Sequence, residues 1–248
     1  MQFTFGQQTQ EGAPYSQIHG LENNYHTITL PQIDRDMLLE EDIYRDPGRP
    51  FRYGYKHEVK YSPKSSGTWE ETADGGMMWR IRFISNDAYA ISFEYEKFNI
   101  PEGGKLYVYT PDYKMIHGAY THLNNTEHQH FSTPLIQGDV AILEYYQPAG
   151  IEGEISLVIT EIIHDYRNIM GFSNDGRDWE CGVNVICETG GGYQGAINSV
   201  AFLDMGGFIC SGAMVNNVRQ DLTPYFLTAW HCVDDDNPST FRFYFNKE

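Results

Sequence analysis

Cysteine is absent from the first 180 residues of the chain and occurs four times in the last 68, at positions 181, 187, 210 and 232. Any disulfide therefore belongs to one C-terminal segment, and an even number of cysteines there indicates an oxidising compartment. Four cysteines allow three pairings, and the residues alone do not select one. A zinc site made from these thiols is disfavoured, because the step of six residues from Cys181 to Cys187 is wider than the paired spacing of zinc motifs.

Basic residues are also scarce: 17 lysines and arginines stand against 34 acidic residues, which gives a formal net charge of -17. Nucleic acid and anionic membranes require a basic face, so neither is expected as a partner. No apolar run approaches the roughly 18 residues that span a bilayer. Residues 1–10 lack the basic start and apolar stretch of a signal peptide. Export is therefore inferred from the cysteines, with a leader already trimmed or the chain a fragment.

The first two thirds of the chain have the pattern of half-buried β-strands. Residues 1–30 are polar and lack a period, which predicts an extended or poorly ordered lead-in, and a short helix is expected at 33–44. Apolar and polar side chains then alternate in segments separated by turns that contain glycine and proline. These segments predict an all-β domain, most simply a sandwich, with strands at 79–85, 89–95, 106–109, 140–145 and 155–162.

Turn-forming residues at Gly171–Gly176 indicate a boundary between two domains. We expect a β-sandwich over 31–168, a linker over 169–178 and a second domain over 179–248. Arg167 and Arg177 are basic residues at this junction where proteolytic processing is expected. Apolar stretches predict further strands in the second domain at 196–203, 208–215, 225–229 and 241–245.

His231 is the strongest indication of chemistry in the chain. It precedes Cys232 and follows the apolar run Tyr225–Leu227, at the predicted end of a strand. A sheet on one side and a crosslink on the other would hold the imidazole in place. A general base that serves a weak nucleophile requires such positioning. Cys210, 22 positions upstream, is a natural partner for Cys232, and closing such a loop stabilises a fold by roughly 3 kcal/mol.

Three runs of the C-terminal segment carry a family resemblance: Cys181–Cys187 (CGVNVIC), Cys210–Asn217 (CSGAMVNN) and Pro224–Cys232 (PYFLTAWHC). In this order and at this spacing they resemble the trypsin-like serine endopeptidases. The resemblance is closest to the secreted bacterial branch that includes lysyl endopeptidase.

This resemblance implies specific roles for the C-terminal residues. His231 would be the general base of a Ser-His-Asp triad, accepting the proton of the serine during attack and returning it to the leaving amine. A disulfide would join Cys210 to Cys232, while Cys181 and Cys187 would pair with cysteines outside the chain. A polypeptide substrate is implied, with no cofactor and no metal.

The N-terminal domain resembles the pro-region that precedes the peptidase domain in members of the same family. The resemblance is carried by Gly67–Trp69, Trp79–Ser85, Phe98–Tyr109 and Gly118–Thr121. By this resemblance the domain contacts its own peptidase domain, assists its folding or masks its cleft, and is removed on maturation.

The family also places the serine nucleophile and the orienting acid well downstream of the histidine, whereas this chain ends at Glu248. We therefore expect an incomplete trypsin-like β-barrel that carries His231 alone, and no hydrolysis by this chain by itself. Asp234, Asp235 and Asp236 are interpreted as a solvated loop, and Ser211 as part of a strand. The expected location is outside a bacterial cell or on its surface.

A second interpretation belongs to another class of protein: a secreted non-catalytic binding or adhesion protein that uses a β-sandwich and a trypsin-like scaffold. His128 and His130 would lie on one face of a strand, but no third ligand completes a metal site there, so a surface pair is expected. A serine motif and an orienting aspartate further along the gene are required by the enzyme and not by the binding protein.

Overall fold

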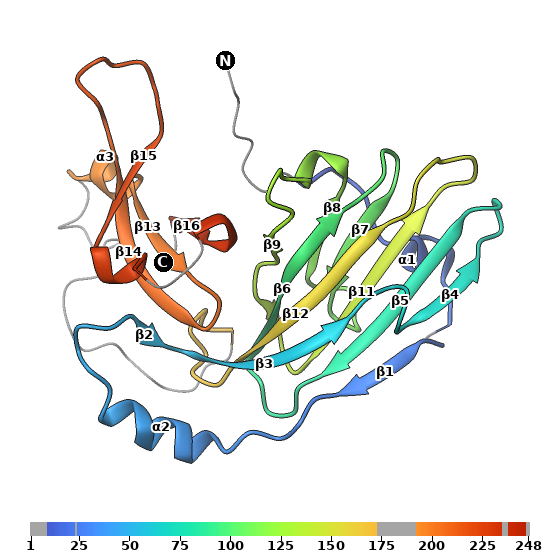
Figure 1. Cartoon of the computed structure of the whole chain (residues 1–248), viewed down its shortest axis with the longest axis horizontal. Helices are drawn as coiled ribbons and strands as arrows, with labels where there is room; N and C mark the ends of the chain where they lie inside the picture. The colour runs from blue at the N-terminus through green and yellow to red at the C-terminus, as the bar shows by residue number, and fades with distance from the viewer. Residues whose placement is uncertain (1–8, 23, 173–191, 235–237, 247–248) are drawn as a thin grey trace.

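Three β-sheets make up most of the regular secondary structure in the computed structural model, which describes residues 9–22, 24–172, 192–234 and 238–246. Two sheets pack face to face as a sandwich around a shared apolar core, and the third, the C-terminal sheet, lies beside the sandwich (Figure 1). The fold is all-β, as the sequence predicts. No helix among these residues is long and apolar enough to cross a membrane.

The first sheet of the sandwich has six strands in the order β1-β5-β11-β7-β8, with β4 also paired to β5. Strand β1 runs parallel to β5, and the other pairs are antiparallel. The strands are β1 (His26–Thr29), β4 (Thr68–Glu71), β5 (Met77–Ile84), β7 (Lys105–Tyr109), β8 (Ile116–Tyr120) and β11 (Val140–Gln147).

The second sheet has five strands in the order β10-β6-β12-β3, with β9 also paired to β6. All of these pairs are antiparallel. The strands are β3 (Gly54–Tyr61), β6 (Ala90–Asn99), β9 (Phe131–Ser132), β10 (Ile136–Gln137) and β12 (Ser156–Asp165).

The core between the two sheets follows the alternation seen in the sequence. Trp79, Ile81 and Phe83 of β5 are fully buried and point toward the second sheet, where Phe93 and Tyr95 of β6 meet them. The rings of Phe83 and Phe93 are tilted, with centroids 5.3 Å apart. The strands predicted at 79–85, 89–95, 106–109, 140–145 and 155–162 are confirmed as β5, β6, β7, β11 and β12.

Within the segment that the sequence assigns to a polar lead-in, residues 9–22 lie on the outer face of the first sheet and residues 26–29 extend its edge. They form helix α1 (Tyr15–His19) and strand β1. The buried carboxylate of Glu144 accepts hydrogen bonds from the backbone N–H of Ser16 at 3.1 Å and from the hydroxyl of Tyr109 at 2.9 Å. Buried polar groups require such partners, so the polar character of this segment matches the polar face that it covers.

Helix α2 (Arg35–Ile43) confirms the short helix expected at 33–44. The side chain of Asp34 caps it by accepting a hydrogen bond from the backbone N–H of Met37 at 3.0 Å. Asp42, at the other end, accepts a hydrogen bond at 2.7 Å from Arg52 on strand β2 (Phe51–Arg52). The chain then passes from β2, which pairs with the C-terminal sheet, into β3 of the sandwich (Figure 1).

The C-terminal sheet has five strands in the order β15-β14-β13-β16, with β2 also paired to β14, and the described residues form no closed barrel. Its strands are β13 (Val200–Asp204), β14 (Phe208–Val215), β15 (Tyr225–Thr228) and β16 (Arg242–Phe245). The strands expected at 208–215, 225–229 and 241–245 are confirmed. The strand expected at 196–203 is partly wrong, because helix α3 (Gln194–Ile197) occupies its beginning.

A buried ion pair lies where the C-terminal sheet meets the sandwich. Arg242 and Asp204, on neighbouring strands β16 and β13, are 2.9 Å apart and their side chains are 3% and 0% exposed. The sandwich completes this pair, because the hydroxyl of Tyr53 donates to Asp204 at 2.7 Å and the carbonyl of Thr133 accepts from Arg242 at 2.6 Å. The pair therefore has the hydrogen bonds to Tyr53 and Thr133 only while both parts are in contact.

Replacement of Arg242 by methionine tests this contact. Arg242→Met leaves the Asp204 carboxylate buried without its counter-charge, so we expect the free energy of unfolding to fall by about 3–5 kcal/mol. Tyr53→Phe removes one hydrogen bond to a charged group and should cost about 2 kcal/mol. Urea denaturation of the three proteins measures both effects.

Lys64→Met is the matched control, because the ion pair between Lys64 and Glu154 has a similar distance of 2.7 Å but is 75% and 80% exposed. Exposed pairs contribute less than about 1 kcal/mol. An Arg242→Met protein no less stable than the Lys64→Met protein would show that the buried pair does not hold the two parts together.

Candidate active site

His231 lies in a tight turn at the end of strand β15. The strand ends at Thr228, Ala229 is extended, and Trp230–Cys232 form the 3-10 helix η3. The backbone N–H of Cys232 closes this turn by donating to the carbonyl of Ala229 at 3.0 Å. Strand β15 is itself paired with β14, so the turn that carries the imidazole begins at a fixed edge of the C-terminal sheet.

A disulfide fixes the other side of the turn. It joins Cys232 to Cys210 on β14, the two cysteines that the family resemblance pairs, with their Cα atoms 6.2 Å apart. Cys232 is buried in an apolar cluster with Leu203, Met205 and Phe241. His231 is therefore held between a strand and a crosslink that is anchored in the core of this sheet.

The imidazole of His231 stays exposed in this arrangement. One of its ring nitrogens lies within 4.8 Å of the sulfurs of Cys210 and Cys232. Histidine and cysteine are metal ligands, but a metal binds the thiolate form, and these two sulfurs are bonded to each other. The cluster is therefore a histidine next to a disulfide and not a metal site. Of its three side chains, only the imidazole is free to act as an acid or base.

Within the described part of the chain, no hydroxyl or carboxylate hydrogen-bonds the ring of His231. Ser211 lies in the middle of β14 opposite Phe202, and its carbonyl accepts a hydrogen bond from the Thr228 hydroxyl at 2.9 Å. Asp234 is exposed after the turn. Cys181, Cys187, Asp235 and Asp236, for which the sequence made predictions, lie outside the described residues.

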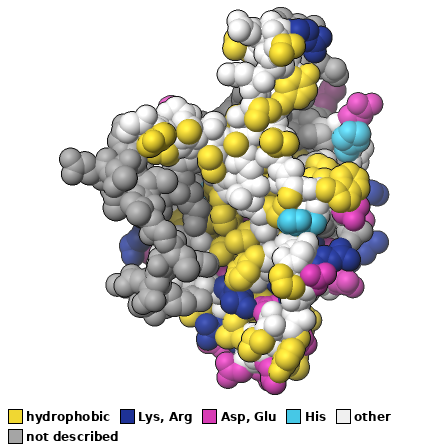
Figure 2. Space-filling view, turned by 90° about the vertical axis from the view of Figure 1, so that its left-hand side faces the viewer, with side chains coloured by type: hydrophobic (Ala, Val, Ile, Leu, Met, Phe, Trp, Pro, Cys, Tyr) yellow, Lys and Arg dark blue, Asp and Glu magenta, His cyan; other side chains and the backbone are white. Residues whose placement is uncertain are grey.

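Apolar side chains are exposed on the C-terminal sheet. Trp230 beside the histidine is 73% exposed and Leu227 on β15 is 65% exposed, and Phe243 and Phe245 of β16 are also exposed. Figure 2 views the molecule from the side of this sheet and shows apolar side chains gathered over that face. Exposed apolar groups in such number are typical of a surface that contacts other polypeptide.

Arg167, one of the two expected processing sites, is not presented to a protease. Its guanidinium is 19% exposed, contacts Asp42 at 2.6 Å and lies 4.8 Å from the centre of the Phe51 ring. The buried carboxylate of Asp165 accepts hydrogen bonds from the backbone N–H groups of Arg167 and Ile169 at 2.8 and 3.0 Å. Cleavage there would require this turn to unfold first, and Arg177 lies outside the described residues.

A serine and a histidine also meet inside the sandwich, a contact that the sequence did not indicate. The hydroxyl of Ser85 lies 2.7 Å from Nδ1 of His164, and the two residues are only 1% and 2% exposed. Burial, together with the nearby His57, lowers the pKa of His164 to about 4, so its ring is neutral at pH 7. A peptide cannot reach this pair, which makes it a buried hydrogen bond rather than a catalytic one.

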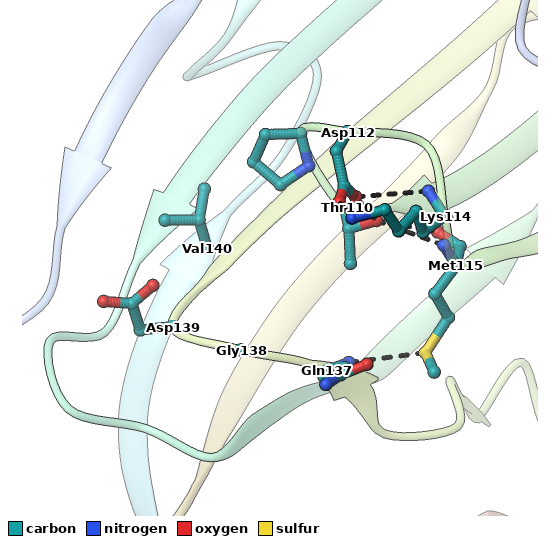
Figure 3. A pocket seen from close by; sticks show the side chains of 9 residues that line it. Thr110, Asp112, Lys114, Met115, Gln137, Gly138, Asp139 and Val140 are labelled. Atoms are coloured by element: carbon teal, nitrogen blue, oxygen red, sulfur yellow. Dashed lines mark hydrogen bonds and ion pairs between the residues drawn. The ribbon is translucent and has the colours of Figure 1, made fainter. Parts of the chain in front are cut away.

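A shallow pocket at one end of the sandwich is the feature that a binding module would use (Figure 3). Its polar groups bind one another: Asp112 accepts hydrogen bonds from the Thr110 hydroxyl at 2.7 Å and from the Lys114 backbone at 3.2 Å. The backbone N–H of Gln137 contacts the sulfur of Met115 at 3.3 Å. Because these side chains are already paired, the pocket offers few groups that converge on a ligand.

Comparison with known proteins bears on the segment that carries His231. Residues 176–248 match the family model described as the C-terminal domain of lysyl endopeptidase. A lysyl endopeptidase of Pseudomonas aeruginosa is 24% identical over 208 residues, which cover 76% of this chain and 45% of that protein. The chain thus spans about half the length of the curated relative that it matches. No solved structure gives a significant match.

The match to the relative extends well beyond the C-terminal segment. It covers 76% of the chain, whereas the segment matched by the family model begins only at residue 176, so it includes residues of the sandwich. Both the N-terminal and the C-terminal parts are therefore involved in the similarity. The chain is thus similar to lysyl endopeptidases both in the segment around His231 and in the sandwich that precedes it.

Proposed function

We propose that this chain is the pro-region and the first part of the peptidase domain of a secreted serine endopeptidase, in which His231 is the general base. The observation that carries the proposal is the geometry of His231: an exposed imidazole on a turn fixed between strand β15 and the Cys210–Cys232 disulfide. The match of residues 176–248 to the lysyl endopeptidase C-terminal domain supports it.

In this proposal His231 accepts the proton of a serine hydroxyl as the serine attacks a peptide carbonyl, and later gives it to the leaving amine. A base in this role must keep one orientation through both steps; the strand and the disulfide hold the turn that carries it, and the orienting acid would fix the ring. The serine and the acid that orients the ring come from other residues of the protein, since none of those described contacts the imidazole. The chain alone is then inactive.

In this proposal the sandwich is the pro-region of the peptidase. Its contact with the C-terminal sheet through Tyr53, Thr133, Asp204 and Arg242 supports a role in folding or masking the peptidase part. The disulfide supports a location outside the cell or on its surface, because such bonds persist in oxidising compartments. The name of the relative supports a basic residue, lysine above all, at the cleaved bond.

Loss of the imidazole is the direct test. In the whole protein that contains this chain, His231→Ala should lower kcat on a lysine-containing peptide by at least about 10⁴-fold, because serine and histidine of a triad act as a unit. Labelling by a serine-directed phosphonate probe should fall with it. Peptides without a basic residue measure the substrate preference in the same assay.

His128→Ala is the matched control, because His128 is an exposed histidine of the sandwich. Its activity should equal that of the wild type. Full activity of the His231→Ala protein would rule out the proposed mechanism, and absence of any labelling in the wild type would favour the non-catalytic binding protein.

The disulfide should matter for both stability and catalysis. Replacing Cys210 and Cys232 by serine opens a crosslink between residues 22 positions apart and should lower the free energy of unfolding by about 3 kcal/mol. The freed turn should also lower kcat more than it raises KM, since the base loses its orientation. Guanidinium denaturation and steady-state kinetics measure the two effects, and an unchanged kcat would show that the crosslink does not orient His231.

A further inference from the structure

The turn between β13 and β14 is the part of the C-terminal sheet that reaches onto the sandwich. The carbonyl of Gly207 in this turn accepts hydrogen bonds from the backbone N–H groups of Tyr53 and Gly54, at 2.9 and 3.0 Å. Gly206 has a φ of 68°, in the left-handed region that glycine favours. The turn is therefore bound to the start of β3 by its backbone.

The carboxyl group of Glu94, on β6 of the sandwich, lies directly over Gly206. A Cβ atom at position 206 would overlap the Oε1 atom of Glu94, so only glycine leaves room for this contact. The residue as a whole is partly exposed, but Oε1 is buried and has no hydrogen-bond partner. An acidic oxygen is thus enclosed between the two parts of the chain without a donor to compensate its charge.

Charged groups of both signs face Glu94 from the surrounding strands. Glu161 of β12 is its direct neighbour across the β6–β12 pair, a like-charge arrangement that disfavours ionisation. Lys56 of β3 offsets Glu161 through an ion pair of 3.0 Å. From the C-terminal sheet, Arg242 and Asp204 face the carboxyl as a pair that is already neutralised. Among the described residues, the two positive charges that favour an ionised Glu94, Arg242 and Lys56, are opposed by the two negative charges of Glu161 and Asp204.

We propose that Glu94 is a proton-dependent latch between the sandwich and the C-terminal sheet: the protonated carboxyl fits the contact with the Gly206 turn, and the ionised carboxylate weakens it. The latch concerns the contact between two parts of this chain and does not depend on peptidase activity. A protein that uses it holds its two parts together more tightly in acid than at neutral pH.

The direction of the pH dependence follows from the pKa of Glu94. Burial raises this pKa from 4.5 to about 7, with Arg242 and Lys56 lowering it and Glu161 and Asp204 raising it. Formation of the contact is therefore coupled to binding of a proton by Glu94. The contact is strongest below the ordinary pKa of this carboxyl group, 4.5. It weakens as the pH rises from about 4.5 to about 7, and does not weaken further above that range.

Other groups titrate in the same range, so the test needs a local readout. Burial raises the pKa of Asp165 to about 6, and burial lowers the pKa of His57 and of His164. Asp165 binds the N–H groups of Arg167 and Ile169 and also lies opposite Gly54 in the β12–β3 pair, so the Glu94→Gln variant is needed to separate its titration from that of Glu94. His57 lies opposite the core residue Ile162 in the β12–β3 pair, and His164 is two residues after Ile162 on β12. Because side chains alternate along a strand, both histidines lie on the core face of the sheet, and Glu94 lies on the other face.

Hydrogen exchange of the Tyr53 and Gly54 amides, measured in the 248-residue chain, reports the contact itself. After correction for the intrinsic pH dependence of exchange, their protection should fall roughly tenfold to a hundredfold between about pH 5 and about pH 8. Glu94→Gln, which keeps the shape of the protonated carboxyl, should retain at pH 8 the protection that the wild type has at pH 5. Glu96→Gln, at an exposed position of the same strand, is the control and should follow the wild type.

Amides of the β5–β11 pair, inside the sandwich, serve as the reference and should be the same in all three proteins. The proposal is overturned if wild-type protection at Tyr53 and Gly54 does not fall over this range. It is equally overturned if the Glu94→Gln protein keeps the pH dependence of the wild type.

Discussion

The ion pair between Arg242 and Asp204 is the interaction on which the arrangement of the whole chain depends. Both charges are buried, and burial alone would lower the pKa of Arg242, but Asp204 and the other acidic groups around the guanidinium together outweigh burial and raise it, so the guanidinium stays charged. A buried pair of this kind adds little net stability, yet removing either partner is costly. It therefore acts mainly by specifying which surfaces meet.

Two groups of the sandwich form hydrogen bonds with this ion pair. Tyr53 donates a hydrogen bond to Asp204, and the carbonyl of Thr133 accepts one from Arg242. Both come from segments far from the pair in the sequence, 151 residues before Asp204 in the case of Tyr53. Once β13 and β16 are fixed by the pair, β14 and β15 follow by hydrogen bonding, and the turn that carries His231 follows β15. The exposed imidazole is thus positioned by a buried contact on another part of the sheet.

The sequence predicted those features that depend on local patterns. Alternation around Trp79 and Phe93 predicted β5 and β6. The apolar run before His231 predicted a strand that ends just ahead of this histidine. Strand β3 was missed, because Lys56, Glu58 and Lys60 alternate with few strongly apolar residues over Gly54–Tyr61.

The interface could not be predicted, because no local pattern marks a charge as buried. Asp204 and Arg242 look like surface residues in the sequence, and so does Glu144 under helix α1. Burial of each is decided by a segment that is distant in the chain. The helix at Gln194–Ile197 was missed for a different reason: four residues are too few to show a helical period.

Calorimetry of the 248-residue chain tests most directly whether the sandwich and the C-terminal sheet form one body. If the buried pair joins them as described, thermal unfolding is a single transition whose calorimetric and van't Hoff enthalpies agree. Two separate transitions, or a calorimetric enthalpy well above the van't Hoff value, would contradict this account, because the C-terminal sheet would then unfold independently of the sandwich.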